Sequence, residues 1–147
     1  PDGCAEGAED LNAGIIQGCR ICYPANTIRW GYGIMPENQL LGSVTVKSVL
    51  TKLSIVSDTA TTSSSGSDNW QFDAYKNAST ALLASAKTTS GAEIAANTEY
   101  DLGTLNATNK YLAVGDTLRI QVTKNGTPTD LSGAKVTFQA HVRKDLA

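Results

Sequence analysis

The sequence predicts an all-β fold, an antiparallel jelly-roll-like β-sandwich that carries an extended N-terminal arm. Ala, Thr, Ser, Gly and Asn make up nearly half of the 147 residues, a composition that suits short strands joined by frequent turns. Apolar residues also alternate with polar ones along several stretches, as they do in strands that bury one face. Parallel strands that are buried on both faces do not alternate in this way, so we expect antiparallel sheets.

The length and charge of the chain exclude several classes of function. A chain of 147 residues fits one domain, with or without an extended arm. It has 12 basic and 14 acidic residues and a formal net charge of −2, which argues against nucleic-acid binding driven by electrostatics. No apolar run reaches the roughly 18 residues of a membrane span. We therefore expect a soluble chain whose partners are neither nucleic acid nor membrane.

Residues 1–40 are predicted to form the arm, and residues 41–147 the sandwich. The first 18 residues contain acidic but no basic residues and show no sustained apolar period. The rest of the segment places large apolar residues on a backbone interrupted by Gly and Pro, which fits a strap that lies on another surface. Seven apolar residues are the expected partner-binding residues of this arm: Ile21, Tyr23, Ile28, Trp30, Tyr32, Ile34 and Met35.

The regular part of the sequence begins near Leu40. Residues 43–47 alternate, whereas Val49, Leu53 and Ile55 continue with the opposite parity, so we expect a bulge or a break near Ser48. The stretch is one long strand or two.

A Thr/Ser/Gly-rich stretch and an ambiguous segment follow. Residues 58–69 are predicted to form a mobile loop that is too polar to bury. Apolar residues at every second position in 70–74 indicate the next strand. Residues 80–87 fit either a strand or a short Ala-rich helix, which the Thr/Ser/Gly run at 88–91 ends.

The C-terminal third gives the clearest alternation. Residues 100–105 alternate, and residues 111–114 lead into a Gly-Asp turn pair. Two further strands each direct one apolar face inward, and their inward residues are Leu118, Ile120 and Val122, then Val136, Phe138, Ala140 and Val142. Altogether seven or eight short strands are expected, which is typical of a sandwich or a jelly roll.

Residues 111–127, YLAVGDTLRIQVTKNGT, resemble a pattern found in β-sandwich virion proteins of tailed bacteriophages. A hydrophobic residue and Gly-Asp open a strand, and a short polar turn and a final alternating strand follow. The chain thus resembles capsid decoration (cement) or head-fibre proteins. The resemblance implies a virion protein on the capsid surface, assembled in the bacterial host cytoplasm, that binds the major capsid protein and holds neighbouring subunits together. A homo-oligomer is expected, with a trimer favoured, since copies on a symmetric shell gain avidity.

The three cysteines allow several interpretations of their chemical role. Cys19 and Cys22 have the Cys-x-x-Cys spacing of redox or zinc sites. Zinc would need two more ligands, for which Cys4 and His141 are the soft candidates, and Tyr23-Pro24 directly after the pair opposes the helix that redox catalysis requires. Idle thiols in the arm are the favoured interpretation; a disulfide with Cys4, a metal site and redox catalysis are the alternatives.

Other candidate groups have simpler structural interpretations. His141 lies on the polar side of its strand, where a solvated or interface histidine is expected rather than a catalytic base. Asp101 and Asp116 are expected to cap turns rather than to form the carboxylate pair of a glycosidase. A calcium site at Asp68 and Asn69 matches no EF-hand spacing.

Three aromatic residues offer a second function. Trp70, Phe72 and Tyr75 are candidates for a sugar-stacking platform, although core packing is favoured for Trp70 and Phe72, which share parity. The sequence therefore predicts a non-enzymatic capsid decoration protein with no catalytic, cofactor or metal residues. The alternative is a carbohydrate-binding β-sandwich, freestanding or on a virion surface.

Overall fold

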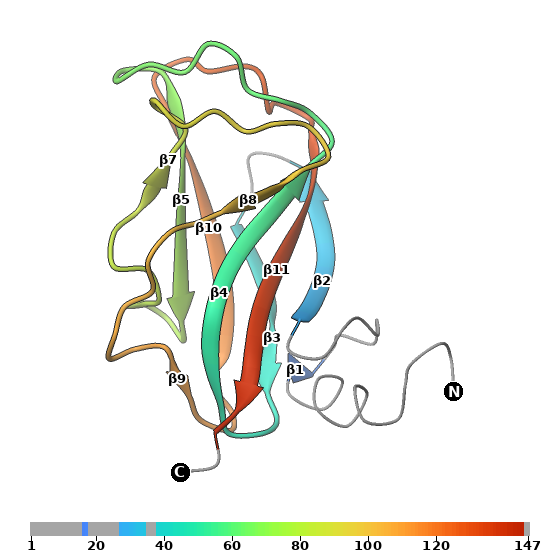
Figure 1. The fold of residues 1–147 in the computed structure, drawn as a ribbon, viewed down its shortest axis with the longest axis vertical. Coiled ribbons are helices and arrows are strands. Elements are labelled where there is room, and N and C mark those ends of the chain that lie inside the picture. Colours follow the sequence, from blue (N-terminus) through green and yellow to red (C-terminus); the bar gives the residue numbers. More distant parts are fainter. Residues whose placement is uncertain (1–15, 18–26, 35–37, 146–147) are drawn as a thin grey trace, which may run out of the picture.

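The computed structural model describes residues 16–17, 27–34 and 38–145, with side chains from Ser43 onward. Two antiparallel sheets pack face to face, and the described part of the chain contains no helix. The predicted all-β antiparallel sandwich is confirmed (Figure 1). No described segment has the length and apolar character of a membrane-spanning helix.

The first sheet is built around β10 (Thr117–Asn125) and β5 (Asn69–Lys76), which pair over eight residues. On the other edge of β10 lies β3 (Asn38–Val44), and the two-residue β1 (Ile16–Gln17) follows β3. Two short strands, β6 (Thr80–Ala81) and β7 (Lys87–Thr88), pair with the remaining edge of β5.

The second sheet is built around β11 (Lys135–Lys144) and β4 (Ser48–Ser57). On the other edge of β11 lies β2 (Thr27–Ile34). Two short strands, β8 (Glu99–Asp101) and β9 (Tyr111–Leu112), pair with the remaining edge of β4.

The strand order is that of a jelly roll. One sheet runs β2-β11-β4-β8 and the other runs β3-β10-β5-β6. From β2 to β5 successive strands lie in opposite sheets, and β10 and β11 do so again, so the chain wraps around the core (Figure 1). The first strands of the wrap, β2 and β3, pair with the last two, β11 and β10.

Alternating side chains fill the space between the sheets, as the sequence pattern predicts. The inward residues of β10 and β11 are all buried, and the largest fully buried side chains are Trp70, Phe72 and Phe138. Core packing of Trp70 and Phe72 is thereby confirmed. Burying a side chain of this size contributes on the order of 2–3 kcal/mol relative to exposure.

The predicted irregularity near Ser48 has two parts. Strand β3 ends at Val44 and β4 begins at Ser48, so the sequence forms two strands. A bulge follows inside β4, because Lys52 lies opposite His141 whereas Leu50 lies opposite Val142. The extra residue is Thr51, whose hydroxyl donates to the carbonyl of His141 at 2.9 Å.

The predicted boundary at residue 40 falls inside β3. In the structure the sandwich also includes residues 27–34 and 38–40, which the sequence pattern places in the arm, because β2 pairs with β11 and β3 pairs with β10. A strand at the edge of a sheet gains a full ladder of main-chain hydrogen bonds on one side. Apart from β1, residues 1–26 lie outside the described residues, so an arm in that segment stays a prediction.

The sequence predicts that residues 58–69 are too polar to bury, and this prediction is wrong at Thr61 and at Asn69, the first residue of β5. Thr61 is buried; its main-chain N–H donates to the carbonyl of Ile94 at 2.9 Å, and its hydroxyl accepts from the N–H of Ile94 at 2.7 Å. Carboxylates hold the following residues, since Asp130 accepts from the N–H of Thr62 and Glu93 accepts from that of Ser64. Because buried polar groups are tolerated once they are hydrogen-bonded, composition alone misjudged this loop.

Candidate functional site

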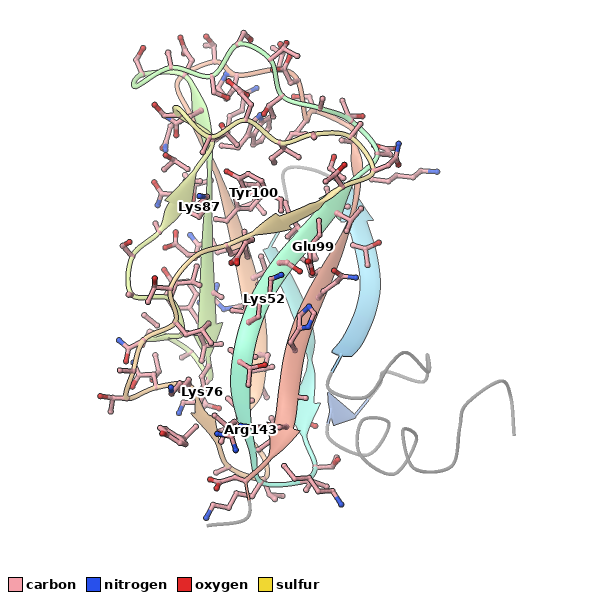
Figure 2. All side chains as sticks on the ribbon, viewed as in Figure 1. Lys52, Lys76, Lys87, Glu99, Tyr100 and Arg143 are labelled. Atoms are coloured by element: carbon pink, nitrogen blue, oxygen red, sulfur yellow. The ribbon has the colours of Figure 1, made fainter. Side chains whose placement is uncertain are left out.

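Polar side chains from three strands meet on the outer face of the second sheet. Lys52 and Ser54 are two residues apart on β4, and Gln139 and His141 are two residues apart on β11, so each pair shares a face. The register places His141 beside Lys52 and Gln139 beside Ser54. Glu99 on β8 completes a group of five, which we call the Glu99 cluster; Figure 2 labels two of its members, Lys52 and Glu99.

The carboxylate of Glu99 is the centre of this cluster. Nζ of Lys52 lies 2.7 Å from Oε1, while Oγ of Ser54 and Nε2 of His141 lie 2.8 Å and 3.1 Å from Oε2. Oγ of Ser54 is also 3.1 Å from Oε1 of Gln139. Because a hydroxyl has a single proton and charged acceptors make the stronger bond, that proton goes to Glu99.

The contacts change the proton affinities of the charged partners. The hydrogen bond from Lys52, followed by that from Ser54, lowers the pKa of Glu99 from 4.5 to about 2. The same contact with Glu99 raises the pKa of Lys52. Both groups are therefore ionised around neutral pH, and the carboxylate ties β4, β8 and β11 together.

This geometry suits a cross-strand clamp better than a hydrolytic site. Nucleophile activation needs a serine hydroxyl that faces an imidazole, which a carboxylate then orients. Here Ser54 is buried and directs its hydroxyl to the carboxylate, and His141 contacts that same carboxylate. A carboxyl group with a pKa of about 2 also holds no proton to donate at neutral pH.

A recess of about 440 Å³ lies beside the cluster on the same face. It opens along the edge of β4, between the part that pairs with β8 and the part that pairs with β9, and its lining includes the bulge residue Thr51. Its charged lining comes from β4, β8, β11 and the segment between β8 and β9, and consists of Lys52, Asp101, Arg143 and Lys110. Figure 2 shows Lys52 near Glu99 and Arg143 farther along the face toward β9.

A second, more apolar recess lies at the end of the sandwich. It has a volume of about 270 Å³ and is lined mainly by residues 111–114, with Lys47 and Asp145 at its border. Tyr111 is 49% exposed and Val114 is 67% exposed, and these two are the exposed large apolar side chains of the described region. Apolar surface at the rim of a recess is a common feature of contact sites.

The predicted partner-binding residues are only partly located. Ile28, Trp30, Tyr32 and Ile34 lie on β2, and their side chains are not described. Ile21, Tyr23 and Met35 lie outside the described residues, as do Cys4, Cys19 and Cys22. The partner-binding role and the state of the thiols therefore stay predictions.

Two candidate carboxylates have the expected turn-capping role. Oδ1 of Asp101 accepts from the N–H of Gly103, and Oδ2 of Asp116 accepts from that of Ala113, both at 2.8 Å.

Around Asp68 and Asn69 the contacts are those of a turn. Asp68 accepts from the N–H of Thr127, and the buried Asn69 donates its amide to the carbonyl of Ser65. Within the described ranges, no three His, Cys, Asp or Glu side chains are arranged to hold a metal ion.

The structure adds residues that the sequence interpretation missed. His141 was placed on the polar face of its strand, which the contact with Glu99 bears out. Lys52, Ser54, Glu99 and Gln139 were not singled out. The sequence does contain a signal, since β4 and β11 each have two polar residues at alternate positions among apolar ones. Only the pairing of the strands shows that these residues meet at Glu99.

Comparison with known proteins gave no relative. No family model matches the chain, and neither a curated protein nor a solved structure matches it.

Proposed function

We propose that the chain is a non-enzymatic structural protein of a tailed-phage virion, a capsid decoration protein that binds the major capsid protein and stabilises the head shell. The observation that carries this proposal is the jelly-roll strand order of the two sheets, an architecture used by viral capsid and lectin domains. The resemblance of residues 111–127 to virion sandwiches supports the same assignment.

Two features of the surface support a binding role. The polar groups of the Glu99 cluster are tied to one another rather than directed at a reactant. At one end of the sandwich, Tyr111 and Val114 present apolar surface beside a recess. A surface of this kind suits a contact with another protein.

The N-terminal segment supplies the second contact in this proposal. In the described region β2 is the last strand of its sheet, beyond β11, and an edge strand can accept or donate main-chain hydrogen bonds to a neighbouring chain. The residues of β2 and those on either side of it would then bind the shell. Trimers on the capsid surface, assembled in the bacterial cytoplasm, complete the proposal.

Sedimentation of virions from the source culture tests the proposal. We expect the full chain to band with intact particles and to be released when the shell is destabilised. A double variant, Tyr111→Ser with Val114→Ser, should lose at least about 90% of its particle association, whereas Lys87→Gln on the other sheet should retain it. A chain that never bands with particles, or that binds equally with both apolar residues replaced, contradicts the assignment.

A further inference from the structure

The recess beside the Glu99 cluster has the volume of a small-ligand site. Its volume of about 440 Å³ lies within the roughly 300–1,000 Å³ that is usual for such sites. A bulge at Thr51 and the gap between β8 and β9 create it. Bulges are common where a sheet shapes a functional surface.

Two cations in the lining have no ionic partner among the residues that the structure describes. Lys52 is bound to Glu99 at 2.7 Å, but Arg143 and Lys110 take part in no ion pair there. The side chain of Lys110 instead faces an aromatic ring, since its Nζ lies 5.7 Å from the ring centre of Tyr111. Arginine presents a planar fork that matches a carboxylate, so a ligand carboxylate would complete this side of the recess.

The other side of the lining offers hydrogen-bond acceptors. Asp101 uses Oδ1 to accept from the N–H of Gly103, and within the described region its Oδ2 accepts no hydrogen bond. Thr51 gives its proton to the carbonyl of His141, so its oxygen is available as an acceptor. Oδ2 of Asp101 and Oγ1 of Thr51 can therefore accept hydrogen bonds from the hydroxyl groups of a ligand.

The mixture of charges discriminates among anions. Counting Glu99 at the border, the site has three cations and two carboxylates. A phosphate or a polyanion would meet the repulsion of Asp101, and a plain hydroxylated ligand would leave Arg143 and Lys110 uncompensated. One carboxylate together with several hydroxyls satisfies both sides, and the partly buried Leu105 provides an apolar contact for ring carbons.

We propose that this recess binds a uronic-acid unit, with its carboxylate at Arg143 and Lys110 and its ring hydroxyls at Asp101 and Thr51. This site is distinct from the sugar platform considered from the sequence, since Trp70 and Phe72 are fully buried. It does not depend on the virion role.

Binding of D-glucuronate and D-galacturonate to the full chain tests the site, with main-chain amide NMR shifts as the readout. We expect saturable shifts at Gly103, Thr104 and Lys110, and at least about tenfold weaker effects from D-glucose, acetate and inorganic phosphate. Equal shifts with glucose, with acetate or with phosphate would overturn the proposal, as would shifts confined to other parts of the sandwich.

Two substitutions separate the roles of the charged groups. Arg143→Gln should weaken uronate binding at least about tenfold, the loss expected for a charge-assisted contact. Asp101→Asn should weaken uronate binding and at the same time strengthen acetate binding, because it removes both a hydroxyl acceptor and a repulsive charge. Lys87→Gln, on β7 of the other sheet, is the matched control and should leave both affinities unchanged. Retained uronate affinity in Arg143→Gln, or a parallel change for both probes in Asp101→Asn, contradicts the assignment.

Discussion

Glu99 illustrates how one side chain couples three strands. Its carboxylate contacts Lys52 and Ser54 on β4 and His141 on β11, while its own strand, β8, has three residues. A strand that short has few main-chain hydrogen bonds of its own. The side-chain contacts of Glu99 therefore add to the main-chain pairing that attaches β8 to β4.

The pH dependence of stability follows from the lowered pKa of Glu99. Folding lowers this pKa from 4.5 to about 2, so the ionised carboxylate stabilises the folded state. The contribution is fully present above about pH 4.5 and is lost as the pH falls toward 2. Because the side chain is partly exposed, we expect Glu99→Gln to lower the free energy of unfolding at pH 7 by roughly 1 kcal/mol. Urea denaturation of both proteins at several pH values from 7 to 2 measures the difference, which should shrink below pH 4.5.

Lys52 provides the control for this prediction. If the two residues act through their charges, Glu99→Gln should cost less in a Lys52→Gln background than it costs alone. If the unfolding free energies of wild type and Glu99→Gln differ by the same amount down to pH 2, packing rather than charge explains the effect.

At the scale of elements, the turn between β10 and β11 depends on a glycine. Gly126 has φ +69°, and a Cβ there would meet the carbonyl oxygen of Ser67 and Oδ1 of Asp68. That same Oδ1 accepts from the N–H of Thr127 at 2.8 Å, so the turn is locked to the loop that precedes β5. An Asn-Gly pair such as Asn125-Gly126 is typical of a turn, but its contact with this loop has no local signal.

Two alanine substitutions distinguish backbone strain from steric clash. Gly91 also has φ +69°, but a Cβ there would meet nothing within 4 Å. We expect Gly91→Ala to cost about 1 kcal/mol of unfolding free energy through strain alone. Gly126→Ala should cost about 2–4 kcal/mol, because the clash is added and the contact of Asp68 is displaced. Thermal and urea denaturation compare the two, and equal losses would contradict the clash.

Local patterns predicted the elements where one face is buried, and they failed where pairing is long-range. Alternation located β5, β10 and β11, because a period of two aligns their apolar residues with the core. Strand β2 was missed although Ile28, Trp30, Tyr32 and Ile34 also alternate, since Gly31 and Gly33 suggested an irregular strap. The Glu99 cluster and the recess required the register of β4 with β8 and β11, which no single stretch of sequence contains.

For the whole molecule, the pairing of β2 with β11 predicts how truncations behave. Removal of residues 1–26 deletes only the short β1 from the described sheets, so we expect a folded domain with cooperative unfolding. Removal of residues 1–40 also deletes β2 and the start of β3, which uncovers edges of β11 and β10. We expect this longer deletion to aggregate or to unfold at least about 10 °C lower, because exposed edges pair readily with other chains. Circular dichroism and size-exclusion chromatography compare the two, and equal melting temperatures would place β2 outside the cooperative fold.

The closing of both sheets by late strands also sets the timing of folding during synthesis. Strand β11 lies between β2 and β4 and pairs with both, and it ends at Lys144. A growing chain on the ribosome cannot form this sheet until β11, the last described strand, has emerged. Until then the edges of the earlier strands stay unpaired. Protection of these edges until β11 emerges, for example by a chaperone, would therefore govern the yield of folded protein more than the strength of any local turn.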